Sequence, residues 1–105
     1  MAARRTLEGG GPVFDRVLKR FREKIRRRDY VMTAHAEEEM DDDGLMILDV
    51  ESAVLTGRIT ERQRDPRTQE WKYVVAGTSM DSNPVGLVCT LGPAGRLVIL
   101  TTYRE

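Results

Sequence analysis

Four runs rich in β-branched and aromatic residues fill the second half of the chain, and this feature limits the fold more than any other. The runs are RITERQR, QEWKYVVAGTS, PVGLVCTLG and RLVILTTYR. Segments of turn-forming composition, DPRT, MDSN and GPAG, separate them. Strands joined by such short turns form an antiparallel meander. The last two runs are apolar on both faces, which predicts central strands covered by helices on at least part of their second face.

The first half of the chain has helical spacing instead. Apolar residues from Val13 to Ile25 recur every three or four positions behind Pro12, a residue suited to a first helical turn. They predict a helix over about 12–28. Its other face is strongly basic, which fits either a solvated surface or a docking surface for nucleic acid or an acidic partner.

Two further helices are expected before the first long strand. Thr33 is a suitable N-cap, and Gly44 a suitable C-terminal stop, for the second helix. His35 would then lie in the first turn of that helix. The third helix is short, at about 48–56, and Gly57 ends it.

The order of these elements predicts one α+β domain over residues 12–105, with about three N-terminal helices followed by a four-stranded antiparallel β-meander. Residues 1–11, which end in three glycines, are expected to be a flexible leader. The side chains expected in or near the core are Val75, Val88 and Ile99, and Trp71 is expected to be partly buried at the sheet.

Composition limits the number of domains and the cellular compartment of the protein. A chain of 105 residues holds one core. The single cysteine, Cys89, excludes an internal disulfide and a cysteine-rich zinc site, and it favours a reducing compartment. No apolar run is long enough to span a bilayer, and the N-terminal segment lacks the apolar core of a signal peptide. We therefore expect a cytoplasmic protein with no membrane partner.

The net charge of zero conceals a strong separation of charge. Residues 1–30 carry ten Lys/Arg and four Asp/Glu, a balance of +6. Residues 31–57 carry eight Asp/Glu and no Lys/Arg, a balance of −8. Residues 58–105 carry seven basic and five acidic residues, a balance of +2. Nucleic-acid binders usually show a basic domain or stripe, and only the first segment qualifies strongly.

The sequence matches the patterns of calcium and transition-metal sites poorly. The segment MDDDGL resembles part of a calcium loop, but a loop in that register needs glutamate at its last position, where Val50 stands. His35, Glu38 and Glu39 can share a helical face, yet a further donor and a second histidine at metal-binding spacing are missing. We expect no metal and no cofactor.

The surroundings of Cys89 argue against a nucleophile. It lies in the apolar strand segment GLVCTLG, where a small core residue is the simpler interpretation.

General acid–base cleavage of RNA needs fewer specific residues than a metal site or a protein nucleophile does. The RNA supplies its own 2′-hydroxyl as nucleophile, so the protein must supply a proton acceptor, a proton donor and cations. His35 is the only histidine, and histidine is the side chain best suited to act as an acid or a base near neutral pH. The catalytic candidates are His35, Lys72 and Tyr103, and the candidates for RNA binding are Arg62, Arg64 and Arg104. The competing interpretation of His35 is an ordinary residue at the start of a helix.

The segment TAHAEEEMDDDGLMILDVESAVLTGRITE resembles the pattern of a bacterial family known as domain of unknown function number 4258. The ending RLVILTTYRE resembles that family's last strand, and the likeness covers about residues 30–105. The family is similar in layout to the small RelE- and BrnT-like ribonuclease toxins. The resemblance implies a metal-independent RNA endonuclease paired with an antitoxin protein.

One position departs from the family pattern. The family commonly has arginine just before the methionine, where this chain has Glu39. If that arginine contacts phosphate, Glu39 reverses the local charge, and neighbouring acidic residues add to the repulsion.

Two functions therefore stay open. The first is an RNA-cleaving toxin that uses His35 as general acid–base. The second is a non-catalytic interaction module, or an inactive family member, that binds a partner protein or itself. In a homodimer the basic first helix would meet the acidic second helix of the other copy.

Overall fold

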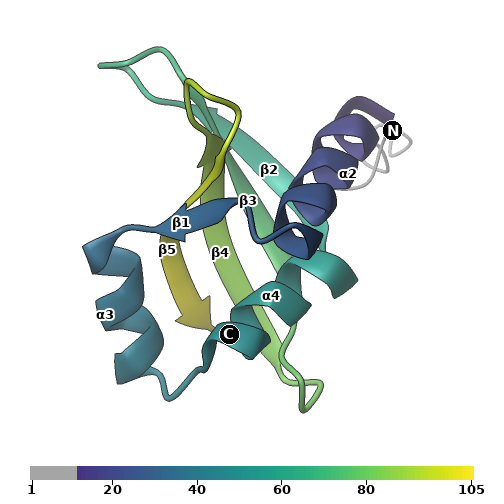
Figure 1. The fold of residues 1–105 in the computed structure, drawn as a ribbon, viewed down its shortest axis with the longest axis vertical. Coiled ribbons are helices and arrows are strands. Elements are labelled where there is room, and N and C mark those ends of the chain that lie inside the picture. The colour runs from purple at the N-terminus through teal and green to yellow at the C-terminus, as the bar shows by residue number, and fades with distance from the viewer. Residues whose placement is uncertain (1–11) are drawn as a thin grey trace, which may run out of the picture.

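The computed structural model describes residues 12–105, so the expected leader at 1–11 lies outside the described residues. The chain forms helices and strands in a simple order (Figure 1). The elements are α2 (Pro12–Arg26), β1 (Tyr30–Met32), α3 (Ala34–Asp42), α4 (Ile47–Thr56), β2 (Arg58–Arg64), β3 (Trp71–Thr78), β4 (Pro84–Leu91) and β5 (Leu97–Arg104). The α+β class and the helices-first order are confirmed.

The sheet differs from the expected one in the number and direction of its strands. It is five-stranded, in the order β1-β5-β4-β3-β2. The four long strands do form an antiparallel meander, but β1 adds to β5 in parallel. The prediction of a purely antiparallel four-stranded sheet was therefore wrong. A strand of three residues between two helices is too short to show a period of two, which is why the sequence did not reveal it.

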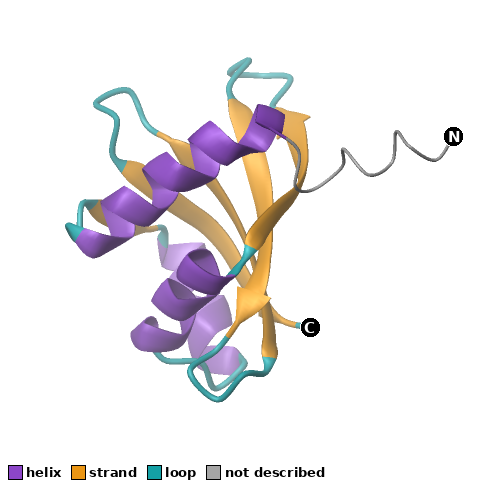
Figure 2. Ribbon diagram, turned by 90° about the vertical axis from the view of Figure 1, so that its right-hand side faces the viewer, coloured by secondary structure: helices purple, strands orange, loops and turns teal. Residues whose placement is uncertain are grey.

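All three described helices lie on the same side of the sheet, as Figure 2 shows. Val75 and Ile99 point to this side and are fully buried. Val88 is only partly buried, on the side that none of the described helices covers. The expectation that helices cover part of the second face was wrong. On that face, apolar side chains of adjacent strands partly shield one another from water.

The helix ends follow the local chemistry of the sequence. Thr33 is the N-cap of α3, and its Oγ1 accepts a hydrogen bond from the backbone N–H of Ala36 at 3.1 Å. After α3, Gly44 adopts φ 70°, and Leu45 N–H donates to the carbonyl of Met40, the pattern of a helix C-terminus closed by glycine. Both predicted boundaries are confirmed.

The helix α4 packs unusually close to β3 because of a glycine. A Cβ at Gly77 would lie 2.0 Å from the backbone oxygen of Ala53, so no larger residue fits without moving the helix. Arg22 of α2 then caps the C-terminal end of α4, where Nη2 donates to Gly57 O at 2.7 Å and Nε donates to Val54 O at 3.3 Å. Arg22 is thus part of the fold and not of a solvated basic face.

No helix within residues 12–105 is both long and apolar enough to cross a membrane.

Candidate functional site

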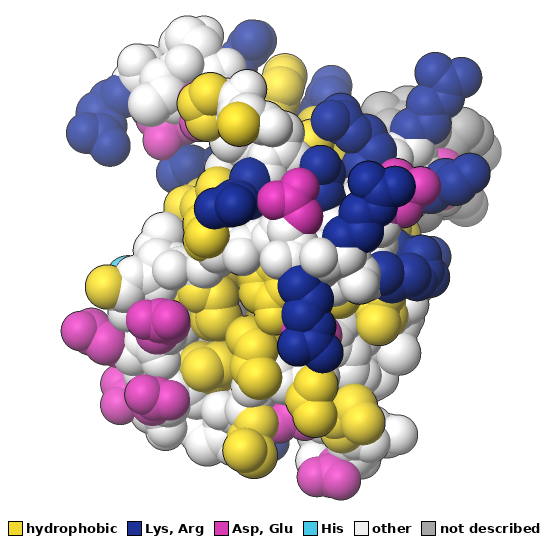
Figure 3. All heavy atoms as spheres, viewed as in Figure 1, with side chains coloured by type: hydrophobic (Ala, Val, Ile, Leu, Met, Phe, Trp, Pro, Cys, Tyr) yellow, Lys and Arg dark blue, Asp and Glu magenta, His cyan; other side chains and the backbone are white. Residues whose placement is uncertain are grey.

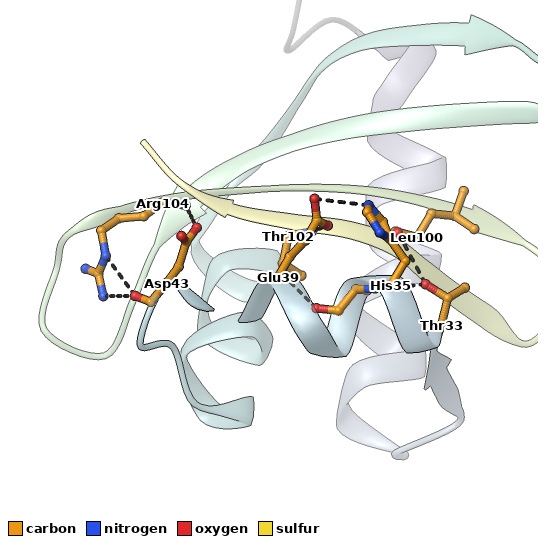
Figure 4. A network of polar contacts seen from close by, with 8 residues as sticks. Thr33, His35, Glu39, Asp43, Leu100, Thr102 and Arg104 are labelled. Atoms are coloured by element: carbon orange, nitrogen blue, oxygen red, sulfur yellow. Dashed lines mark hydrogen bonds and ion pairs between the residues drawn. The ribbon is translucent and has the colours of Figure 1, made fainter. Parts of the chain in front are cut away.

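The acidic helix α3 lies beside the second half of β5, at the point where β1 has ended (Figure 4). The turn between β1 and α3 is fixed at Thr33. Its N–H donates to Ile99 O at 3.0 Å, and its Oγ1 donates to Leu100 O at 3.3 Å. The helix therefore runs along the edge of β5 that β1 leaves open.

Two carboxylates, one in α3 and one at its C-cap, accept hydrogen bonds from the backbone N–H groups of that edge. Glu39 Oε1 accepts from the N–H of Thr102 at 3.1 Å, and Asp43 Oδ2 accepts from the N–H of Arg104 at 2.9 Å (Figure 4). Thr102 also donates through Oγ1 to Ala36 O at 3.1 Å and is fully buried. An unpaired strand edge is costly inside a protein, so these side chains take the place of a neighbouring strand.

His35 lies in the first turn of α3, as predicted. Its Nε2 is 3.1 Å from Glu39 Oε2, and 67% of its side chain is exposed. Glu39 thus joins the histidine to the backbone of β5. The other exposed side chains of the helix are mostly acidic: Glu37, Glu38, Asp41 and Asp42. His35 therefore has a carboxylate partner and a negatively charged surrounding.

Arg104 lies at the far end of α3 and closes its C-terminus. Its Nη2 donates to Asp43 O at 2.7 Å, and its Nε donates to the same oxygen at 3.2 Å. A cation at this position is favoured by the helix dipole. One of the three guanidinium groups predicted to bind RNA thus already has a structural partner.

Arg62 and Arg64 lie at another part of the molecule, on β2. Both guanidinium groups are placed over the ring of Trp71, at 4.1 and 4.7 Å from its centroid. Such contacts are attractive because the ring face is electron-rich. Trp71 is partly buried at the start of β3, which confirms its predicted place.

Lys72 and Tyr103, the other two catalytic candidates, lie on the same face of the sheet but on different strands and far from each other. Lys72 Nζ pairs with Asp65 Oδ2 at 3.1 Å. The pKa of Asp65 is lowered, first by the hydrogen bond from Arg67 N–H and then by that from Lys72. Lys72 precedes Tyr73, which is level with Cys89 of β4 and through it with Ile99 of β5. Strand spacings then put Lys72 about 15–20 Å from Tyr103.

Tyr103 lies on the face of the sheet opposite the described helices. Its ring covers Gly86, where a Cβ would come within 2.3 Å of the ring carbons. Burial, followed by the negative charges of Glu105 and Glu61, raises the pKa of the Tyr103 hydroxyl. The structure therefore brings His35, Tyr103 and Arg104 near α3 and β5, whereas Lys72, Arg62 and Arg64 lie on β2 and β3.

Nucleophilic and metal chemistry have little support. Cys89 is fully buried, and burial raises the pKa of its thiol, so the reactive thiolate is disfavoured. Within residues 12–105, no group of three or more His, Cys, Asp or Glu side chains could hold a metal ion.

A second polar pair, Tyr30 and Glu51, was not predicted from the sequence. Tyr30 of β1 donates its hydroxyl hydrogen bond to Glu51 Oε2 of α4, and Glu51 is buried. Burial, and then this hydrogen bond, raise the pKa of Tyr30. The two residues are 21 positions apart, so spacing along the chain gave no signal for the pair.

An apolar surface borders this pair. A pocket of about 420 Å³ lies along β1, lined by Arg28, Tyr30, Val31, Met32, Glu37 and Ile47. Beside it, Leu48 of α4 is 51% exposed, and Met46 and Leu55 are also exposed. In Figure 3 hydrophobic side chains gather over β1 and α4, between the acidic helix α3 and the basic side of the molecule around α2.

These features define a small α+β protein with a helix-capped sheet edge and an exposed apolar surface. The family model for a domain of unknown function (DUF4258) matches residues 32–104, which is most of the chain. The chain belongs to this family. No curated protein and no solved structure matches it.

Proposed function

We propose that this member of the family is a non-catalytic protein-interaction module. The observation that carries the proposal is the exposed apolar surface over β1 and α4, which includes Ile47 and Leu48 and continues through the pocket to Val31 at the strand edge. Apolar side chains grouped on a surface and bordered by charged residues are typical of protein-binding sites.

The surroundings of His35 support the same proposal. RNA cleavage needs cations where the phosphate binds, yet the exposed residues of α3 around His35 are mostly acidic. Arg104, a cation at the other end of this helix, already caps α3. Glu39 stabilises the β5 edge, so at the position where the family pattern has arginine this chain has an acceptor for a backbone N–H.

RNA cleavage is a second candidate because of one observation. The exposed imidazole of His35 is oriented by the Glu39 carboxylate, an arrangement that general bases use. A RelE- or BrnT-like toxin, with an antitoxin partner, would follow from that function. For both candidates we propose a cytoplasmic setting, since the one cysteine is an unpaired thiol.

An RNA-cleavage assay separates the two candidates. Single-stranded RNA is incubated with the full chain and with His35→Ala in EDTA, which removes metal-dependent contaminants. The interaction module predicts no cleavage by either protein, and circular dichroism verifies that the variant folds. Cleavage by the parent that is lost in a folded His35→Ala variant would overturn the proposal.

The apolar surface is tested in the same preparation. The native chain should bind a hydrophobic fluorescent dye, and Leu48→Glu should reduce that binding while the fold is kept. The matched control is Glu70→Gln, an exposed change in the turn before β3, far along the chain from α4. Equal dye binding by parent and Leu48→Glu would count against this surface.

A further inference from the structure

The edges of the sheet differ in how they are protected against the addition of a further strand. The free edge of β2 carries charged side chains at Arg58, Glu61, Arg62 and Arg64, and a register shift interrupts it between Ile59 and Glu61. Charges and bulges are the usual protection of an edge strand. The second half of β5 is capped by Glu39 and Asp43. Both of these edges are closed to a further strand.

Nothing within residues 12–105 protects the outer edge of β1 in this way. Leu97 N–H donates to Asp29 O, and Thr33 N–H donates to Ile99 O, so odd-numbered residues of this segment bond to β5. The N–H and C=O groups of Tyr30 and Met32 therefore point away from the sheet. Among the described residues, none forms a backbone hydrogen bond with them. The side chains of β1 are apolar or aromatic, and they line the pocket described above.

The two ends of this open edge carry opposite charges. Arg28 lines the pocket just before β1, and Glu37 lines it just after, on α3. Both side chains are exposed, and no ion pair within residues 12–105 engages either of them. The same polarity holds on a larger scale, since residues 1–30 carry +6 and residues 31–57 carry −8. The strand β1 lies at the boundary between these segments.

We propose that a second copy of this chain adds to the open edge of β1, antiparallel, about a two-fold axis beside Val31. Tyr30 of one copy then faces Met32 of the other, and each pair exchanges both backbone hydrogen bonds. The two sheets join into one. This inference rests on the proposed function and names the partner of the interaction module.

Charge favours this partner and this direction. In an antiparallel pair the beginning of one strand lies beside the end of the other, so Arg28 of each copy approaches Glu37 of the other copy. A parallel arrangement would place Arg28 beside Arg28 and is disfavoured. A two-fold axis also lets the same patch serve both copies, as in most homodimers.

The apolar side chains add contact area to the interface that three residues of backbone alone do not provide. Val31 is 39% exposed and faces its own copy across the axis, in a position where antiparallel side chains lie close together. The pockets of the two copies meet, and Ile47 forms part of each. An interface of this small kind predicts a dissociation constant on the order of micromolar.

Sedimentation of charge-reversal variants tests the dimer. The full chain, Arg28→Glu, Glu37→Arg and the double variant are compared over a range of concentrations. Each single change puts like charges together and should weaken the dimer about tenfold, whereas the double variant restores opposite charges and should recover most of the affinity. Arg27→Glu is the matched control, since Arg27 is exposed but does not line the pocket. Circular dichroism verifies that each variant is folded.

A second pair of variants tests the axis. Val31→Glu places two carboxylates face to face and should abolish the dimer, whereas Val31→Thr keeps the shape and should weaken it only slightly. A parent that stays monomeric at all concentrations would overturn the inference, as would a dimer indifferent to both Arg28→Glu and Val31→Glu. Such a result without RNA cleavage would leave the interaction module in place with a different partner, whereas cleavage that depends on His35 would overturn the module itself.

Discussion

At the scale of single residues, Glu39 has a different role from the one its sequence position suggested. In the sequence it replaces an arginine of the family pattern and looks like a repulsive charge near RNA. In the fold it accepts the N–H of Thr102 and holds His35. The regular spacing of His35, Glu39 and Asp43, four residues apart, places them on one stripe of α3. Only the position of β5 reveals what that stripe contacts.

Removal of the Glu39 carboxylate should therefore destabilise the fold. Glu39→Ala leaves the N–H of Thr102 without its acceptor, and we expect a loss of about 1–3 kcal/mol in the free energy of unfolding. Glu39→Gln keeps an acceptor oxygen and should cost less. Chemical denaturation of both variants and the parent measures this difference. Equal losses for Ala and Gln would show that the carbonyl-type acceptor is not what stabilises the edge.

A second residue-scale prediction concerns acid. Asp49 accepts hydrogen bonds from the N–H groups of Met46 and Met80, and these bonds lower its pKa. A carboxyl group with a folded pKa below its unfolded value of about 4 stabilises the fold above that pH. The contribution is lost as the pH falls through the lowered pKa.

Denaturation at pH 7 and at pH 3 tests this directly. The parent should lose more stability on acidification than Asp49→Asn, which cannot titrate at this position. Asp42→Asn is the control, because Asp42 is exposed and no hydrogen bond from another described side chain or loop reaches its carboxylate. A parent and an Asp49→Asn variant with the same loss between the two pH values would contradict the prediction.

At the scale of elements, the sequence predicted what depends on local chemistry. The helix ends at Thr33 and Gly44 and the first long strand, Arg58–Arg64, are observed where they were expected. The short strand β1 was missed because its pairing with β5 joins residues that lie 67 positions apart. The large distance between Lys72 and Tyr103 was not predicted for a related reason, since strand order decides which residues meet.

The contact between α4 and β3 offers an element-scale test. Gly77→Ala would place a Cβ 2.0 Å from the backbone oxygen of Ala53, so α4 must move. We expect a loss of about 1–3 kcal/mol, the range of overpacked cores. Gly92→Ala is the matched control, because its Cβ would lie 3.4 Å from a Val98 methyl group, near ordinary contact. Thermal unfolding that is equally affected by the two changes would contradict the close packing.

At the scale of the whole molecule, charge and apolar surface are distributed along one direction. The basic α2 and the acidic α3 lie on either side of β1, and the exposed apolar residues lie between them (Figure 3). The sequence showed the separation of charge and suggested that the two helices pair across a dimer. The structure adds the open strand edge between them, which converts a general attraction into a defined register.

Amide hydrogen exchange, followed residue by residue by NMR at low and at high protein concentration, observes this register directly. The N–H groups of Tyr30 and Met32 should exchange rapidly in the dilute protein and more slowly as the concentration rises, because the second copy accepts their hydrogen bonds. The N–H of Thr102 serves as an internal reference, since Glu39 already accepts it within one chain. Exchange at Tyr30 and Met32 that is equally fast at every concentration would contradict the pairing of β1 with a second copy.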